Sequence, residues 1–249
     1  MTDRSPASPQ ASSTPSSPAG TPVSRHATAL APLLAPTGDI LIDERRRDIT
    51  GLVLAGGLGR RMSPDGAGLD KGLVEMRGKP MVAHVIERLA PQVGTIVVNA
   101  NRNAERYAAF GHPVVPDAID GYAGPLAGLH AGLGAARTRW LVTCPCDSPF
   151  LPADLVARLW TALQAADGGP AQLAVARTGD GQAHPVFALV DCRLRDNLEA
   201  FLASGRRKID AWYAPLKVVE VDFPDEAAFR NINTQEELRV NEGAGTKDP

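Results

Sequence analysis

From Asp48 onward, short apolar runs alternate with longer amphipathic segments, and glycines or prolines separate the two. Apolar runs rich in β-branched residues predict buried strands, whereas segments with helical periodicity predict helices. Parallel strands need a crossover connection between them, so this alternation favours parallel pairing with both faces of the sheet covered. The sequence therefore predicts an α/β fold, a single three-layer domain with a mostly parallel central sheet.

The expected strands and helices follow from the same pattern. Strands are expected over residues 51–55, 95–99, 114–116, 140–144, 172–177, 185–190 and 218–222. Helices are expected over residues 81–89, 104–110, 126–136, 153–165 and 194–203.

The first 46 residues differ in composition from the rest of the chain. They are rich in Ser, Pro, Ala and Thr, carry no aromatic residue and show no periodicity, so we expect a disordered tail. An apolar run long enough for a secretory signal is missing from it. We expect three segments: the tail 1–46, the folded α/β domain 47–241 and a flexible C-terminal tail 242–249.

Composition narrows the classes of partner. A formal net charge of −2 gives no bulk attraction to nucleic acid or to an anionic membrane, and no apolar run approaches the roughly 20 residues that span a bilayer. The three cysteines, Cys144, Cys146 and Cys192, do not form a disulfide framework, which favours the reducing cytoplasm. Cys144 and Cys146 lack the further ligands of a structural zinc site.

Polar residues follow four of the expected strands. Gly56 and Gly57 come after the first strand, Asn99-Ala100-Asn101 after the second, Asp117 after the third and Asp147 after the fourth. In open α/β sheets, ligands bind outside the carboxyl ends of the strands. We therefore expect these residues to share one edge of the sheet.

The glycines after the first strand precede a cationic stretch, Arg60-Arg61-Met62, and later Asp70-Lys71. Glycine lets backbone N–H groups approach an anion, and the cations supply charge for phosphate oxygens. The dinucleotide fingerprint fails because Met62 stands where its last glycine should be. The P-loop pattern fails because Pro80 follows Gly78-Lys79. A nucleoside triphosphate site of another type is indicated.

Several separate motifs carry a family resemblance. In order they are LAGG…RRM, DKGL, GKP, VVNANR, GPLAG, CPCDSPF, HP and NINT followed by EEL, and they span residues 49–240. Together they resemble the molybdenum cofactor guanylyltransferases, in the sugar-nucleotidyltransferase-like superfamily, which have a Rossmann-like nucleotidyltransferase domain.

The resemblance implies an enzyme that transfers GMP from GTP to the terminal phosphate of molybdopterin, or of its molybdenum form, and releases pyrophosphate. The product is molybdopterin guanine dinucleotide. It further implies Mg²⁺ as cofactor. We also expect a monomer that makes transient contact with molybdenum-insertion proteins and apo-molybdoenzymes.

By this resemblance, Arg61 and Lys71 neutralise charge on the triphosphate and its transition state, the alternative being a solvated charged loop. Asp147 matches the Mg²⁺ ligand, and an aspartate before Ser-Pro can also cap a following helix. These three are the expected catalytic residues. The expected GTP contacts are Leu54, Ala55, Gly56, Gly57, Lys71, Asn99, Asp117 and Asp147.

For Asn99 the alternative is a plain strand-end turn residue, and whether Asp117 contacts base or ribose stays open. Asn231 and Asn233 match the molybdopterin side of the cleft, since an amide offers donor and acceptor to a pterin edge. The same segment predicts a helix start, with Thr234 as N-cap and Glu237 as its capping-box partner.

Two other functions are consistent with these residues. Cytidylyltransferases acting on the same pterin resemble LAAG, so Gly56 favours GTP over CTP. A nucleotide-binding regulatory module without catalysis would have lost the phosphate and metal groups, whereas Arg61, Lys71 and Asp147 are present. The segment 63–69 is longer than the family's usual linker, but loop closure entropy grows slowly with length, so Lys71 should still reach the phosphates.

Overall fold

The computed structural model describes residues 46–55, 58–59, 69–119, 124–166, 171–179 and 181–243. Every described residue belongs to the unit Pro36–Pro249. Its main sheet has seven strands: β1 (Ile49–Leu54), β6 (Thr95–Asn99), β7 (Val114–Val115), β8 (Trp140–Pro145), β9 (Leu173–Thr178), β10 (Ala183–Asp191) and β11 (Val218–Phe223).

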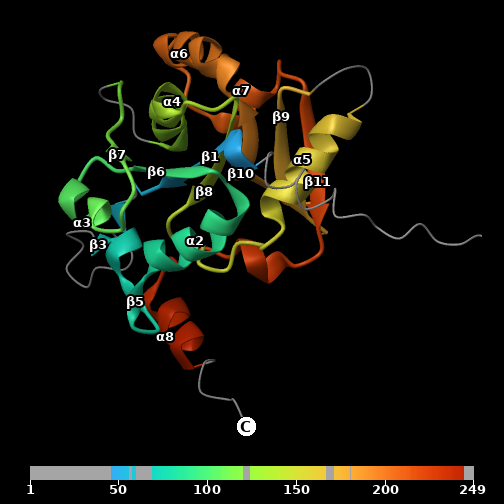
Figure 1. Ribbon diagram of the computed structural model, residues 1–249. Helices are drawn as coiled ribbons and strands as arrows, with labels where there is room; N and C mark the ends of the chain where they lie inside the picture. The colour runs from blue at the N-terminus through green and yellow to red at the C-terminus, as the bar shows by residue number, and fades with distance from the viewer. Residues whose placement is uncertain are drawn as a thin grey trace, which may run out of the picture. The chain divides into compact units, whose positions relative to one another are not determined.

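The strand order is β11-β9-β10-β8-β1-β6-β7 (Figure 1). The pairs β1–β6, β1–β8, β6–β7 and β9–β11 are parallel, as the alternating pattern predicts. β10 is the exception and runs antiparallel to both β8 and β9. Only residues 179–182 separate β9 from β10, and so short a connection joins antiparallel neighbours because it cannot cross over the sheet.

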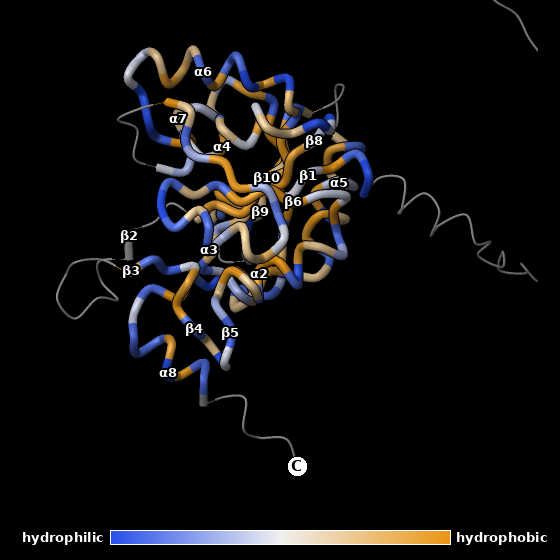
Figure 2. Tube along the Cα trace, turned by 60° about the vertical axis from the view of Figure 1, so that its left-hand side comes forward, coloured by the Kyte–Doolittle hydropathy of each residue, from blue (hydrophilic) through white to orange (hydrophobic). Residues whose placement is uncertain are grey.

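Two layers of helices cover the sheet. The helices are α2 (Met81–Leu89), α3 (Ala104–Ala108), α4 (Pro125–Ala135), α5 (Leu155–Ala165), α6 (Arg195–Ala203), α7 (Ile209–Tyr213) and α8 (Gln235–Gly243). One apolar core lies beneath α2, α3 and α5, and a second lies beneath α4, α6 and α7. In Figure 2 the strands form the apolar interior and polar residues colour the outer helix surfaces. No helix in the described ranges is long and apolar enough to cross a membrane.

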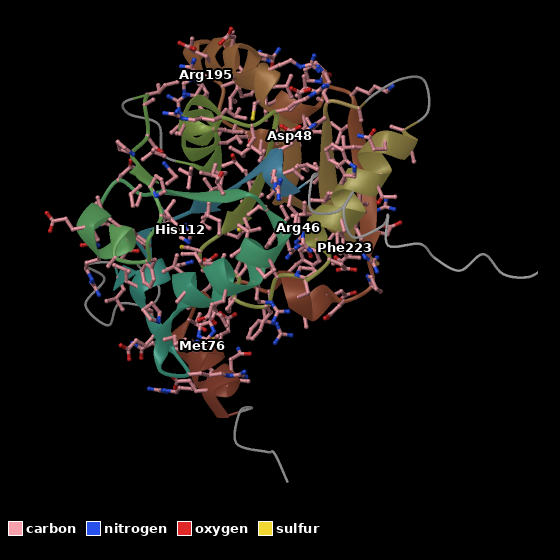
Figure 3. The ribbon with its side chains drawn as sticks, in the orientation of Figure 1. Arg46, Asp48, Met76, His112, Arg195 and Phe223 are labelled. Carbon is pink, nitrogen blue, oxygen red and sulfur yellow. The ribbon has the colours of Figure 1, made fainter. Side chains whose placement is uncertain are left out.

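Two small hairpins and α8 lie beyond the main sheet. The hairpins are β2 (Leu58–Gly59) with β3 (Leu69–Asp70), and β4 (Glu75–Met76) with β5 (Lys79–Pro80). A 3-10 turn, η2 (Lys71–Leu73), connects β3 to β4. Met76 packs with Met81 and Ile232 in a separate buried cluster beside α8, and Figure 3 labels Met76 there. Both hairpins and α7 are absent from the sequence-based prediction, because each is too short for a periodic pattern.

Candidate active site

The carboxyl ends of the central strands meet, as predicted. The amide of Ala55 donates to the carbonyl of Asn99 at 2.8 Å, and the amide of Cys146 donates to the carbonyl of Leu54 at 3.0 Å. The amide of Ala100 donates to Val115 at 3.0 Å. The residues that follow β1, β6, β7 and β8 therefore lie at one edge of the sheet.

Lys71 and Asp147 meet at this edge. Nζ of Lys71 lies 3.1 Å from Oδ2 of Asp147, and it also donates to Oδ1 of Asn233. The two charged side chains are only 18% and 11% exposed, which weakens solvent screening of the pair. The capping role for Asp147 is not seen, because α5 begins at Leu155 with Asp154 as its N-cap.

The segment 231–233 is fixed from two sides. The amide of Ile232 donates to the carbonyl of Asp147 at 2.9 Å, and the Ile232 side chain is fully buried in the cluster with Met76 and Met81. The Ser148 hydroxyl and the Asn231 amide oxygen form a further hydrogen bond. The structure thus brings the two predicted asparagines beside the Lys71–Asp147 pair.

The predicted capping box is confirmed. The Glu237 amide donates to Oγ1 of Thr234 at 3.1 Å, and the Glu237 carboxylate accepts from the Thr234 amide at 3.0 Å. The same carboxylate accepts from the Asn233 amide at 2.6 Å. These donors, that of Asn233 first, hold the pKa of Glu237 below its ordinary value. The start of α8 is thereby tied to the segment that carries Asn233.

Asn99 and Asp117 form a second polar group at the sheet edge. The Asn99 amide nitrogen donates to Oδ1 of Asp117 at 2.9 Å and to the Val115 carbonyl at 3.2 Å. Asn101 pairs with the same carboxylate residue twice, donating to Oδ2 at 2.8 Å and accepting from the Asp117 amide at 2.7 Å. The sequence predicted Asn101 at this edge, but its two bonds to Asp117 are seen only in the structure.

Several of the expected contacts lie outside the described residues. These are Gly56, Gly57, Arg61 and the segment 63–68. Leu54 and Ala55 are described, at the end of β1 and directly after it.

A cleft of about 530 Å³ opens beside Asn231. It is lined by β8, β9, β10 and the segment after β11, and its walls include His184, Phe229 and Arg230. The His184 ring stacks on Phe229 with centroids 4.6 Å apart and planes 21° from parallel, and its Nε2 lies 3.1 Å from Oγ1 of Thr178. Sequence reasoning gave His184 no role, because a lone histidine before a strand carries no signal of its partners.

The donor set for a metal is sparse. Across the described ranges, no group of three or more His, Cys, Asp or Glu side chains is arranged to hold an ion. Asp147 offers one carboxylate at the sheet edge. One carboxylate is what Mg²⁺ commonly takes from a protein when substrate phosphates and water complete its coordination, so the site fits that ion.

A protein-family comparison agrees with this geometry. The model of the MobA-like NTP transferase domain matches residues 51–218, from β1 to the start of β11. The chain belongs to the MobA-like NTP transferase domain family. The resemblance found in the motifs is confirmed, and this family member is a nucleotidyltransferase.

Curated relatives match over most of the length of this chain. A molybdenum cofactor guanylyltransferase of Cupriavidus taiwanensis is 51% identical over 199 residues, which cover 79% of this chain and 98% of the relative. A protein of the same name from Ralstonia nicotianae is 52% identical over 197 residues, covering 77% of this chain and 95% of the relative.

Solved structures share the architecture. Molybdopterin-guanine dinucleotide biosynthesis protein A from Archaeoglobus fulgidus superposes with a TM-score of 0.63 at 25% identity, covering 80% of this chain and 100% of that one. A 4-diphosphocytidyl-2C-methyl-D-erythritol synthase from Anaerococcus prevotii superposes with a TM-score of 0.59 at 14% identity, covering 80% and 98%. The latter likeness concerns the fold alone.

Proposed function

We propose that this MobA-like protein transfers GMP from GTP to the terminal phosphate of molybdopterin, or of its molybdenum form. The observation that carries the proposal is the position of the Lys71–Asp147 pair. It lies at the sheet edge with the Asn99–Asp117 group, and Asn231 and the cleft adjoin it through the segment after β11. Relatives at 51% identity that are named molybdenum cofactor guanylyltransferase support the same reaction.

In the proposed reaction, an oxygen of the molybdopterin phosphate attacks the α-phosphorus of GTP. A new P–O bond forms, the bond from that phosphorus to the bridging oxygen breaks, and pyrophosphate leaves with the bond's electron pair. The protein acts by positioning and by charge stabilisation, as in other phosphorus transfers of this type. The ammonium of Lys71, with three N–H donors, would neutralise charge on the triphosphate as it develops.

The other predicted residues would bind GTP or the pterin substrate. Arg61 would add positive charge to the triphosphate, and Leu54, Ala55, Gly56 and Gly57 would offer backbone groups to the nucleotide. Asn99 and Asp117 would bind the guanosine. A carboxylate suits guanine because N1–H and the 2-amino group are donors on one edge, and a site built for such donors rejects bases that lack them. Asn231 and Asn233 would bind the pterin side.

Asp147 would hold Mg²⁺, which would neutralise phosphate charge and stabilise the pyrophosphate leaving group. Without nucleotide, Lys71 compensates the Asp147 carboxylate, which is only 8% exposed as a residue. A buried carboxylate without such a partner is costly, so the ion pair with Lys71 offsets part of the cost of burying Asp147.

The test is pyrophosphate release by the purified full-length chain with Mg²⁺ and molybdopterin, given GTP or CTP. We expect turnover with GTP, and losses of about a hundredfold or more in Lys71→Ala and Asp147→Ala. Lys79→Ala is the matched control, since Lys79 forms an exposed pair with Glu87 at 2.7 Å outside the site. Preference for CTP would make the protein a cytidylyltransferase. Absence of turnover with either nucleotide would favour the regulatory module.

We also propose that the reaction takes place in the cytoplasm, where transient contact with molybdenum-insertion proteins and apo-molybdoenzymes would deliver the cofactor. The support is the set of free thiols at Cys144, Cys146 and Cys192 in the structure, which suits a reducing compartment.

A further inference from the structure

Tyr107 on α3 contacts the residue that precedes Lys71. Its hydroxyl donates to Oδ1 of Asp70, and the Asn103 amide donates to Oδ2 of the same carboxylate at 2.8 Å. Figure 1 shows α3 beside β3, the short strand that ends at Asp70. Both carboxylate oxygens of Asp70 are therefore held by α3 and the residue just before it.

The turn η2 packs directly against Tyr107. A Cβ atom built on Gly72 would lie 2.5 Å from the Tyr107 hydroxyl oxygen and 3.1 Å from Sγ of Cys146. A real Cβ atom does not approach another atom as closely as 2.5 Å, so the packing of η2 against Tyr107 requires glycine at position 72. Cys146 immediately precedes Asp147. The turn that carries Lys71 is thus enclosed between Tyr107 and the strand end that carries Asp147.

The Tyr107 side chain is fully buried, and burial raises the pKa of its phenol. The hydroxyl therefore stays protonated and acts as a donor throughout the working pH range of a cytoplasmic enzyme. Packing alone would be served by a phenylalanine at this position, because the ring already lies in the apolar core beneath α2 and α5. The hydroxyl is explained by its bond to Asp70.

Lys71 needs such support because its own side chain is long. The ammonium of Lys71 stands on a flexible four-carbon stem. Its two hydrogen-bond partners in the described site are Asp147 and Asn233, and in the proposed reaction Asp147 would hold Mg²⁺ while Asn233 would bind the pterin side. When those two bonds change, a fixed backbone at η2 limits the range of positions that the Lys71 ammonium can occupy.

We propose that Tyr107 is a positioning residue for Lys71, acting through Asp70 and the turn η2. The inference rests on the proposed guanylyl transfer, in which Lys71 serves the triphosphate. Tyr107 itself touches neither substrate nor reacting atoms.

The experiment is a double-mutant cycle of Tyr107→Phe and Lys71→Ala in the full-length chain, measured by pyrophosphate release. We expect Tyr107→Phe to lower kcat by about tenfold or more in the wild-type background, since small misplacements of a catalytic group have costs of this order. In the Lys71→Ala background the same change should lower kcat by less than about twofold, because residues that act as a unit are non-additive. Equal effects in both backgrounds would overturn the proposal.

Thr50→Val is the matched control. Thr50 is 1% exposed and its hydroxyl lies 2.7 Å from that of Thr138, at the opposite end of β1 from the site. Like Tyr107→Phe, the substitution Thr50→Val removes one buried hydroxyl, but it does so away from the site. It therefore measures the effect of losing a buried hydroxyl alone, and its kcat should stay within about twofold of wild type.

A second measurement does not depend on turnover. Amide hydrogen exchange over residues 71–74 should be faster in Tyr107→Phe and unchanged in Thr50→Val, without any substrate. Wild-type protein that releases no pyrophosphate would refute the proposed function, whereas unchanged exchange would refute the positioning role. If Tyr107→Phe does not fold, Asp70→Ala replaces it, because it removes both acceptor oxygens and hence the bonds to Tyr107 and Asn103.

Discussion

A Cβ atom placed on Gly128 would lie 2.2 Å from Oδ1 of Asn99. Gly128 is on α4 and Asn99 ends β6, so the glycine lets the helix approach the end of the strand. Asn99 cannot yield easily, because its amide nitrogen is bonded to Asp117 and to the carbonyl of Val115. The Asn99–Asp117 group therefore depends on the absence of a side chain at Gly128.

Gly128→Ala should weaken GTP binding by about tenfold or more, since displaced Asn99 loses bonds that leave buried polar groups unpaired. Calorimetric titration with GTP and Mg²⁺ measures the effect. Gly134→Ala is the matched control in the same helix, because its Cβ would lie 3.3 Å from the flexible end of Arg195. GTP affinity should be kept there, with stability equal or higher by up to about 1 kcal/mol. Equal affinities in the two variants would contradict this account.

Asn101 is expected to act through Asp117. Asn101→Ala removes both hydrogen bonds to Asp117 and should raise the KM for GTP several-fold. Asn101→Asp should be worse, because a second carboxylate would stand against the first, and like charges at this distance repel. Steady-state kinetics of the three proteins test the order. A smaller defect in Asn101→Asp than in Asn101→Ala would show that Asp117 is not held in this way.

The cleft beside Asn231 is expected to bind the pterin substrate. His184→Ala removes the ring that stacks on Phe229 in its wall and should raise the KM for molybdopterin by about fivefold or more, leaving the KM for GTP within about twofold. His112→Ala, in the connection between α3 and β7, is the control and should change neither. If only the KM for GTP rises, molybdopterin binds at another part of the surface and not in this cleft.

Glu237 should give α8 a pH-dependent contribution to stability. Its pKa is depressed in the folded protein by the Asn233 and Thr234 amides, so the carboxylate is stabilising above its unfolded pKa and that contribution is lost as pH falls through the folded value. Glu237→Ala should cost about 1 kcal/mol at pH 7, and the difference should shrink as the pH falls below the ordinary pKa of a glutamate. Urea unfolding at several pH values measures this. A difference that is constant with pH would exclude the charge as its source.

Local sequence signals account for much of the fold. The helix Met81–Leu89 and the strand Thr95–Asn99 have the predicted bounds, because each carries its full periodic pattern between clear turn residues. The capping box of Thr234 and Glu237 was predictable for the same reason, since its bonds join residues three apart. Short elements such as Ile209–Tyr213 have too few residues to show a period. This helix is held by packing, because Trp212 and Tyr213 are buried in the apolar core beneath α4 and α6.

The sequence by itself determined the α/β class, the sheet edge that gathers the polar residues, and the family. Tertiary structure decided which of those residues meet. The contact between Lys71 and Asp147 joins positions 76 residues apart, and Tyr107 reaches Asp70 across 37. Periodicity and capping depend on neighbours along the chain, whereas these contacts depend on strand order and on how closely a glycine lets two segments pack. That is why the contacts of Asn101 with Asp117, of His184 with Phe229 and of Tyr107 with Asp70 are seen only in the folded chain.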